Sequence, residues 1–553
     1  MTSQILSPCV SILLTTAVFA GTVAFAGPSF AQAPSALTGK VSSHEEGVME
    51  GVLVTAKRAG STIAVSVVTN ARGEYSFPRE RLEPGKYAIA IRAVGYELSG
   101  PASADVTARE TARDLDLVKA KDLEHQLSSG EWLQSFPGTK PFKEALFNCT
   151  SCHSLERPAK SHYNAEEMAK VVQRMSTWAQ GSMPTQPQPQ LGRKIGPPTA
   201  GQMALGKYIS TINLSEGERP YPLKTDPRPK GKATRVIITE YDLPRPQAMP
   251  HDAFLDARGF VWYSDFGAQY IGRLDPKTGK ATEYPIPVSK PGAPTGSLNI
   301  EPARDGTIWI GNMMQGSLVR FDPKTEKFQS WGSPTFVERN EARIAMVTPG
   351  QSQIDGKVWI GGDFEYQFDI KTGQWTTIDY LKGQPAGAKD HGSYGVASDS
   401  KNNFYGMELN ADYIIKVDSK TLVPSYFQTP TPNSGPRRGH FDNQDRLWFA
   451  ENRGQNIAMF DAKTGKFQEW KMPTPYSTPY DAVFDDKTYA WTGGMANDHV
   501  SRLNVKTGEI VDYLLPSETN IRRVDVNKSV TPSVLWVGNN HKATLVKVEP
   551  LDP

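Results

Sequence analysis

Cysteine is scarce in this chain, with only three in 553 residues. Cys9 precedes an apolar N-terminal run, and Cys149 and Cys152 lie close together in the motif Cys-Thr-Ser-Cys-His, which ends at His153. If the N-terminal run is removed, only two thiols remain, so a fold held by a framework of disulfides is excluded. The function of the pair must therefore come from local chemistry.

Neither sign of charge is in excess. Lys and Arg number 61 and Asp and Glu 59, which gives a formal net charge of +2. This balance provides no general attraction to nucleic acid or to an anionic membrane surface. We therefore expect no nucleic-acid partner, and other partners have to be inferred from individual sites. The length allows about three or four domains.

The N-terminal segment has an apolar middle but no Lys or Arg. Ala31-Gln32-Ala33 fits the small-x-small rule for signal cleavage, so residues 1–33 are predicted to be a signal peptide and the protein periplasmic; Ala24-Phe25-Ala26 is a second candidate. The missing positive charge leaves a retained anchor as the alternative. A membrane partner is therefore expected only if the segment is not cleaved.

Residues 37–118 alternate short β-branched runs with turn sequences. This pattern predicts a small β-sandwich. The phrases "TNARGEYSF" and "LEPGKYAIAIRAVGY" resemble the carboxypeptidase regulatory-like (transthyretin-like) domain. The resemblance implies a spacer or adhesion module without catalysis of its own.

Over residues 125–216, which contain the two cysteines, the spacing of apolar residues becomes that of helices. Asn164 and Thr199 are the expected N-caps of two helices, with Glu167 completing a capping box behind Asn164. Residues 217–233 are rich in Pro and Lys and are predicted to be an interdomain linker.

The motif at Cys149, Cys152 and His153 predicts one covalently attached heme c. Two thiols one turn apart can add to the heme vinyl groups, while the adjacent imidazole reaches the iron. A zinc site would need further ligands in suitable spacing, and only His162 is near. A thioredoxin-like pair would need a βαβ setting, which a helical segment does not provide.

The phrases "EALFNCTSCH" and "GKYISTINL" resemble small class I-like cytochromes c. The resemblance implies a methionine as the second iron ligand. Met175, which follows Arg174 on a helix, is the preferred ligand, and Met183 in a Pro-rich loop is the alternative. A thioether ligand raises the heme potential, so we expect a periplasmic electron-transfer partner.

Aromatic anchors recur through the rest of the chain at intervals of roughly 43 to 50 residues. They are Trp262, Trp309, Trp359, Tyr405, Trp448, Trp491 and Trp536. Phrases such as "IGRLDPKTGK" follow most anchors, and four strands per unit predict a seven-bladed β-propeller over residues 234–553. The last unit lacks an outer strand, which residues 235–244 are expected to supply. The fold class is therefore mainly β: a propeller preceded by a small β-sandwich and a small α-helical cytochrome c domain.

Three residues past each anchor lies a ring of equivalent positions. They are Asp265, Asn312, Gly362, Glu408, Glu451, Gly494 and Asn539. The three carboxylates, Asp265, Glu408 and Glu451, could hold a hard cation such as Ca²⁺ or Mg²⁺. The alternative is that they are ordinary hydrated polar groups of a propeller channel.

Histidine is rare, with nine in the chain, yet several lie in the propeller. His251, His391 and His440 are placed near the innermost strands. Together with Glu451 they are predicted to form a general-base site or a site for a transition metal such as copper.

The phrases "RLWFAENRGQNIAMFDAKTGKFQEWKMP" and "FVWYSDFGAQYIGRLDPKTGKATEYPIP" resemble the virginiamycin B (streptogramin) lyase family from about residue 235 to 553. The resemblance implies a seven-bladed propeller that opens a cyclic depsipeptide by metal-assisted elimination, with a channel histidine as base. Glu451 in "WFAE" and His251 match that pattern. In the blade of Glu451, however, Arg437 and Arg438 occupy the opening positions.

Because elimination needs no electrons, the predicted heme favours an oxidoreductase. In this hypothesis the channel oxidises a bound small molecule and passes electrons to heme. No motif for a two-electron cofactor is visible in the sequence. The alternatives are a non-enzymatic electron-transfer and recognition protein, or a metal-assisted lyase acting on a cyclic peptide or ester.

Overall fold

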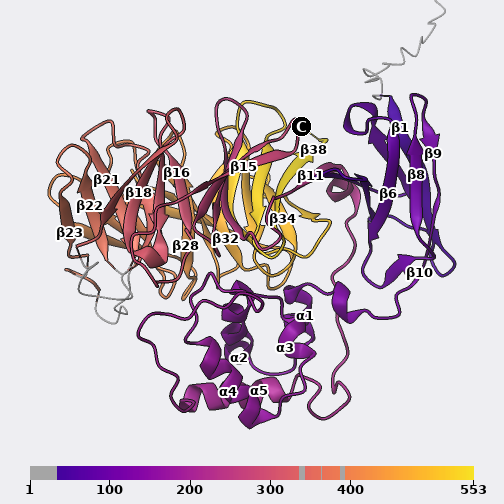
Figure 1. Cartoon of the computed structure of the whole chain (residues 1–553), viewed down its shortest axis with the longest axis horizontal. Coiled ribbons are helices and arrows are strands. Elements are labelled where there is room, and N and C mark those ends of the chain that lie inside the picture. The colour runs from indigo at the N-terminus through magenta and orange to yellow at the C-terminus, as the bar shows by residue number, and fades with distance from the viewer. Residues whose placement is uncertain (1–33, 335–342, 363, 381, 386–392, 553) are drawn as a thin grey trace, which may run out of the picture.

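The computed structural model describes residues 34–552, except 335–342, 363, 381 and 386–392 (Figure 1). A sandwich of strands lies beside a broad β-propeller, and a helical segment lies below it in this view. The predicted signal peptide, residues 1–33, and His391 fall outside the described residues. Among the described residues, no helix has the length and apolar character needed to span a membrane.

The N-terminal part is a β-sandwich, as the alternating pattern predicts. Its strands are β1 (Ser35–Ser43), β2 (Gly47–Val48), β3 (Leu53–Arg58), β4 (Ile63–Val68), β5 (Glu74–Pro78), β6 (Gly85–Arg92), β7 (Tyr96–Leu98), β8 (Ala102–Val106), β9 (Thr111–Ala112) and β10 (Leu115–Lys119). β1 pairs with β2, β5, β9 and β10, while β3, β4, β6 and β8 form the second sheet. Inward side chains such as Leu37, Val54 and Phe77 are fully buried between the sheets.

The next part is helical. Its elements are η2 (Glu124–Gln126), α1 (Ser129–Ser135), α2 (Lys140–Ala145), η3 (Leu146–Ser151), α3 (Glu156–Ala159), α4 (Ala165–Met175) and α5 (Ala200–Ser210). The predicted caps are confirmed, because Asn164 and Thr199 each form a capping box. α4 and α5 pack closely at Gly206, where a Cβ atom would come within 2.6 Å of the Ala169 backbone nitrogen.

Six four-stranded antiparallel sheets follow one another in chain order. Their strands are β12 (Pro250–Leu255), β13 (Val261–Asp265), β14 (Tyr270–Asp275), β15 (Lys280–Pro285); β16 (Asn299–Pro302), β17 (Ile308–Asn312), β18 (Ser317–Asp322), β19 (Lys327–Gly332); β20 (Ile344–Thr348), β21 (Lys357–Gly362), β22 (Glu365–Asp369), β23 (Trp375–Ile378); β24 (Gly395–Ser398), β25 (Phe404–Met407), β26 (Tyr413–Val417), β27 (Pro424–Gln428); β28 (Pro436–Phe441), β29 (Arg446–Glu451), β30 (Asn456–Asp461), β31 (Lys466–Lys471); and β32 (Pro479–Phe484), β33 (Tyr489–Gly494), β34 (His499–Asn504), β35 (Ile510–Leu514). Two short 3₁₀ helices, η4 (Gly231–Thr234) and η5 (Met313–Gln315), accompany them.

The predicted closing strand is confirmed. β36 (Ile521–Asn527), β37 (Val534–Asn539) and β38 (Thr544–Pro550) are followed across the sheet by β11 (Val236–Asp242). β11 pairs with β38 along its whole length, from Val236 opposite Pro550 to Asp242 opposite Thr544. The first strand of the propeller in the sequence therefore completes the last sheet of the propeller.

The same sheet continues into the sandwich, which the sequence pattern does not predict. β11 pairs on its other side with β4, from Ile237 opposite Val67 to Tyr241 opposite Ile63. The result is one eight-stranded sheet shared by both parts. The outer edge of the closing sheet is thus covered, which removes an exposed strand edge.

The aromatic anchors pack between neighbouring sheets. Trp448 on β29 is 1% exposed and stacks on Phe484 of β32, with ring centroids 4.8 Å apart. Such pairs contribute about 0.5–1.5 kcal/mol beyond their buried area. The repeat in the sequence therefore reflects one packing position repeated around the propeller.

Candidate functional site

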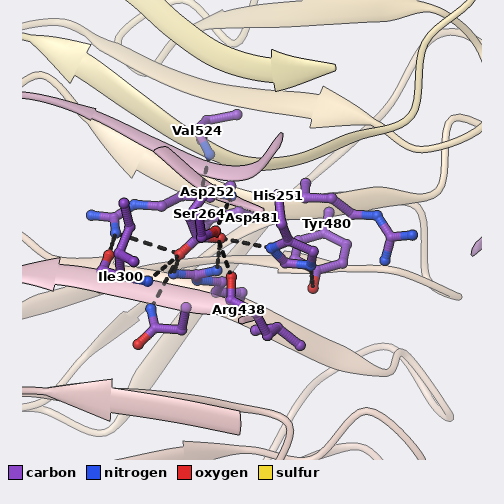
Figure 2. Close-up of polar contacts among 12 residues, drawn as sticks. His251, Asp252, Ser264, Ile300, Arg438, Tyr480, Asp481 and Val524 are labelled. Carbon is purple, nitrogen blue, oxygen red and sulfur yellow. Dashed lines mark hydrogen bonds and ion pairs between the residues drawn. The ribbon is translucent and has the colours of Figure 1, made fainter. Parts of the chain in front are cut away.

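The starts of the innermost strands bring polar side chains together in the centre of the propeller (Figure 2). His251 and Asp252 come from β12, Arg438 from β28, and Tyr480 and Asp481 from β32. All five are buried, with exposed fractions of 1% or less. The innermost strands therefore bring these polar groups together in a buried cluster.

Asp252 is the hub of this cluster. Arg438 donates to its two carboxylate oxygens over 2.7 and 2.6 Å, and the Ile300 backbone nitrogen donates over 3.2 Å. Burial alone would raise the pKa of Asp252, but Arg438 and His251 outweigh it and hold that pKa far below its usual range. Arg523 pairs in turn with Glu301 over 2.9 Å. These ion pairs occupy the centre of the propeller.

His251 is enclosed by the same network. Its Nδ1 atom lies 2.8 Å from Asp252, and the Tyr480 hydroxyl lies 3.0 Å from its Nε2 atom. Burial lowers the pKa of His251 to about 4, so its ring stays neutral near pH 7. With no exposed surface, His251 is out of reach of a dissolved molecule in this conformation.

The ring predicted to bind a cation is not brought together. Asp265 pairs with Arg245 and accepts from the Gly267 backbone over 2.9 Å, while Glu451 accepts from Asn456 over 2.7 Å. Asp265 and Glu451 are thus each bonded to groups near their own strands. In the part of the chain that is described, no three His, Cys, Asp or Glu side chains are grouped to hold a metal ion.

Two buried carboxyl groups in neighbouring sheets lack full hydrogen bonding. Neither oxygen of Glu408 has a partner among the described residues, and Glu365 uses only one oxygen, which accepts from the Ser393 backbone over 2.8 Å. Burial raises the pKa of Glu365 to about 8 and that of Glu408 to about 7. Comparing equivalent positions of the repeats does not find Glu365, because Gly362 is the residue at the ring position of that repeat.

A cavity of about 540 Å³ lies at one mouth of the channel, where the innermost strands end. Its wall includes His440, Glu301, Arg304, Gln351 and Asp442. His440 Nε2 lies 3.0 Å from the buried carboxylate of Asp481, which also accepts from the Val524 backbone over 3.1 Å. Of the predicted catalytic residues that are described, His440 is the one placed on this cavity wall.

The cysteine segment is docked on the other face of the propeller. Cys149 lies in η3 and Cys152 directly after it, and no disulfide joins them. The Thr150 carbonyl accepts from Asn520 and from His541, each over 2.9 Å. Burial raises the pKa of Cys149 to about 12 and raises that of Cys152 as well. Both thiols are therefore protonated near neutral pH.

A second cavity, of about 480 Å³, adjoins this segment. Cys152, His153, Met183 and His541 contribute to its wall, whereas Met175, the last residue of α4, does not. The His153 Nδ1 atom bonds to the Ser154 carbonyl over 2.7 Å, and burial lowers the pKa of His153. The structure thus places Met183, rather than the preferred Met175, beside His153.

Two family models match the chain. Residues 288–539 match the virginiamycin B lyase family, and residues 36–118 match the carboxypeptidase regulatory-like domain. No curated protein matches.

Solved structures with a similar fold include virginiamycin B lyase from Staphylococcus aureus, at 19% identity over 57% of this chain and 99% of that chain, with a TM-score of 0.48. A streptogramin B lyase is 19% identical over 58% of this chain and 100% of its own, with a TM-score of 0.49. A catalytically inactive S. aureus virginiamycin B lyase with quinupristin is also 19% identical, over 57% and 99%, with a TM-score of 0.48.

The predicted function, a c-type cytochrome that oxidises a small molecule in its channel, is contradicted. The propeller matches a lyase family, and neither family match covers the helical segment. The channel centre, where the substrate was expected, is filled by the ion pairs of Asp252 and Glu301. The heme expected at Cys149 and Cys152 is tested by none of these matches and stays a prediction. The chain thus joins a virginiamycin B lyase-like propeller to an N-terminal carboxypeptidase regulatory-like domain.

Proposed function

We propose that the propeller cleaves an ester-linked substrate by base-assisted elimination in the cavity at its channel mouth, with His440 as the base. The observation that carries the proposal is the contact between His440 and the buried Asp481 on the wall of a 540 Å³ cavity. The match of residues 288–539 to a lyase family supports the reaction class. We infer that the six sheets, together with β36, β37, β38 and β11, are the seven blades of this propeller.

Asp481 sets the tautomer of His440. Its carboxylate is fully buried and accepts from the His440 Nε2–H group, so the Nδ1 atom carries the lone pair. A buried carboxylate that holds an imidazole in one tautomer also stabilises the imidazolium formed when the base takes a proton. The Val524 backbone contact fixes the carboxylate in turn.

The proposed step uses only groups of this chain. His440 Nδ1 removes the proton from the carbon next to a substrate carbonyl, and the C–H electrons form a carbon–carbon double bond as the bond to the leaving oxygen breaks. The imidazolium then returns the proton to that oxygen. Arg304 on the same wall supplies positive charge for the carbonyl oxygen, where negative charge develops.

The test is turnover of ester-linked cyclic peptides, with quinupristin included as one probe, followed by mass spectrometry. Elimination within a ring gives an opened product of unchanged mass, whereas hydrolysis adds one water. We expect His440→Gln to lower kcat by about 10²–10⁴-fold, the usual contribution of a general base. His541→Gln, on the opposite face, is the matched control. Absence of cleavage across the panel, or full activity in His440→Gln, would reject the proposal.

We also propose that Cys149 and Cys152 attach one heme in the periplasm, with His153 and Met183 toward the iron. Two observations support this. The 480 Å³ cavity is lined by Cys152, His153 and Met183, and the contact of His153 Nδ1 with the Ser154 carbonyl leaves the His153 Nε2 atom available to bind a metal. Such a heme would supply a one-electron redox centre. Alkaline pyridine spectra of exported protein test this: a heme absorbance lost in Cys149→Ser is expected, and colourless wild-type protein would refute it.

A further inference from the structure

Among the described residues, two buried arginines at the covered end of the channel have no carboxylate partner. Arg437 and Arg522 are 9% and 2% exposed, and neither forms an ion pair in the part of the chain that is described. Their neighbours in sequence behave differently, because Arg438 pairs with Asp252 and Arg523 with Glu301. Each Arg-Arg pair thus has one member that is neutralised and one that is not.

The contacts of the unpaired arginines are neutral. Arg437 lies 2.9 Å from the Met495 sulfur, and its Nε atom has no partner in the described part of the chain, while Arg522 contacts Asn520 and the Ser151 carbonyl. Burial and the nearby positive charge of Arg437 lower the pKa of Arg522. Two buried like charges without a counter-ion are strongly unfavourable, so this arrangement calls for an anion.

Nearby aromatic rings compensate only in part. The Arg437 guanidinium lies 4.1 Å from the Tyr480 ring centroid and 4.8 Å from that of Tyr394. The Tyr394 and Tyr480 hydroxyls are 2.5 Å apart. Burial would raise the pKa of Tyr394, but Arg437 and Arg522 outweigh it and hold that pKa below its usual value. The local potential therefore favours negative charge.

The surroundings favour an anion with an apolar part. Met249, Met313 and Met346 are buried in one cluster on this side of the propeller, and Met183 of the helical segment packs against it. The cysteine segment lies beside the arginines, since Arg522 reaches the Ser151 carbonyl.

We propose that Arg437 and Arg522 form a carboxylate-binding site between the propeller and the helical segment. Guanidinium groups bind carboxylates through strong, charge-assisted hydrogen bonds. The carboxylate comes either from a free small acid or from a group bonded to Cys149 and Cys152. The two sources share one chemistry and are separated by the experiment.

The experiment measures the melting temperature of the full chain in sodium propionate and in sodium chloride at equal ionic strength. A ligand that binds only the folded protein raises this temperature. We expect propionate to stabilise the form of the protein in which the site is open, either the wild type or the cysteine variant described below, with at least tenfold weaker apparent affinity once Arg522→Gln is added to that form. Arg258→Gln, an exposed arginine beside Asp256, is the matched control. Arg522→Lys keeps the charge and should retain part of the response if Arg522→Gln does not fold.

The double variant Cys149→Ser, Cys152→Ser identifies the source. A propionate response in this variant but not in the wild type supports a carboxylate carried by an attached group, and a response in both supports a free acid. Absence of a response in both, or a response that Arg522→Gln leaves unchanged in the responding form, overturns the proposal.

Discussion

The buried carboxyl group of Glu365 makes a sharp prediction for the substitution Glu365→Gln. The side chain has no exposed surface, and its pKa is raised from 4.5 to about 8 by burial. One pKa unit corresponds to about 1.4 kcal/mol, so ionising Glu365 at pH 8 costs at most about 5 kcal/mol. A glutamine carries no charge and keeps the oxygen that accepts from Ser393.

The sign follows from proton binding. The unfolded chain releases the Glu365 proton near pH 4.5, whereas the folded protein holds it until about pH 8. The contribution of this group to stability is therefore fully present at low pH and is lost as the pH rises from 4.5 to 8. Because local relaxation and water entry reduce the full penalty, we expect Glu365→Gln to stabilise the protein by about 2–4 kcal/mol at pH 8.

The assay is urea unfolding followed by tryptophan fluorescence at pH 5 and pH 8. At pH 5 the variant and the wild type should differ by under about 1 kcal/mol, since the folded protein keeps this proton and pH 5 lies only just above the pKa of 4.5 in the unfolded chain. Glu45→Gln, at an exposed glutamate of the sandwich, is the matched control. A gain in stability that is equal at both pH values, or a loss at pH 8, would refute the reasoning.

Three further substitutions test other parts of the structure. Asp252→Asn breaks the buried pair with Arg438 and should lower the free energy of unfolding by about 3–5 kcal/mol; a loss under 1 kcal/mol in urea titration would show that the pair is dispensable. Ser66→Pro removes a backbone donor from β4, which lies between β3 and β11, and should cost about 3 kcal/mol in the same measurement; an unchanged midpoint would argue against the shared sheet. Asn164→Ala removes the cap of α4 and should cost about 1 kcal/mol by thermal circular dichroism, with no expected effect on turnover in the distant cavity.

Much of the fold can be predicted from local signals in the sequence. The aromatic anchors repeat because each fills the same position between neighbouring sheets, as Trp448 does against Phe484. The closing strand can be predicted because the last repeat lacks a phrase that occurs before the first. The caps at Asn164 and Thr199 need only a pattern four residues long.

The site is harder to predict, because equivalent positions do not imply convergent side chains. Asp265 and Glu451 occupy the same place in their repeats, yet each bonds to groups of its own sheet. Glu365 lies outside the ring position and is recognised only through its burial. The pairing of β4 with β11 depends on the register of two strands from different parts, which no local pattern encodes.

The shared sheet has a consequence for how the chain is made. β11 leaves the ribosome long before β38, since about 300 residues separate them, and at about 5–20 residues per second the delay is about 15–60 s. During that time β4 can already pair with β11 and hold it in an extended form. The N-terminal part then acts as a built-in template: it shields an unpaired strand from other chains during synthesis and presents it ready for the C-terminus.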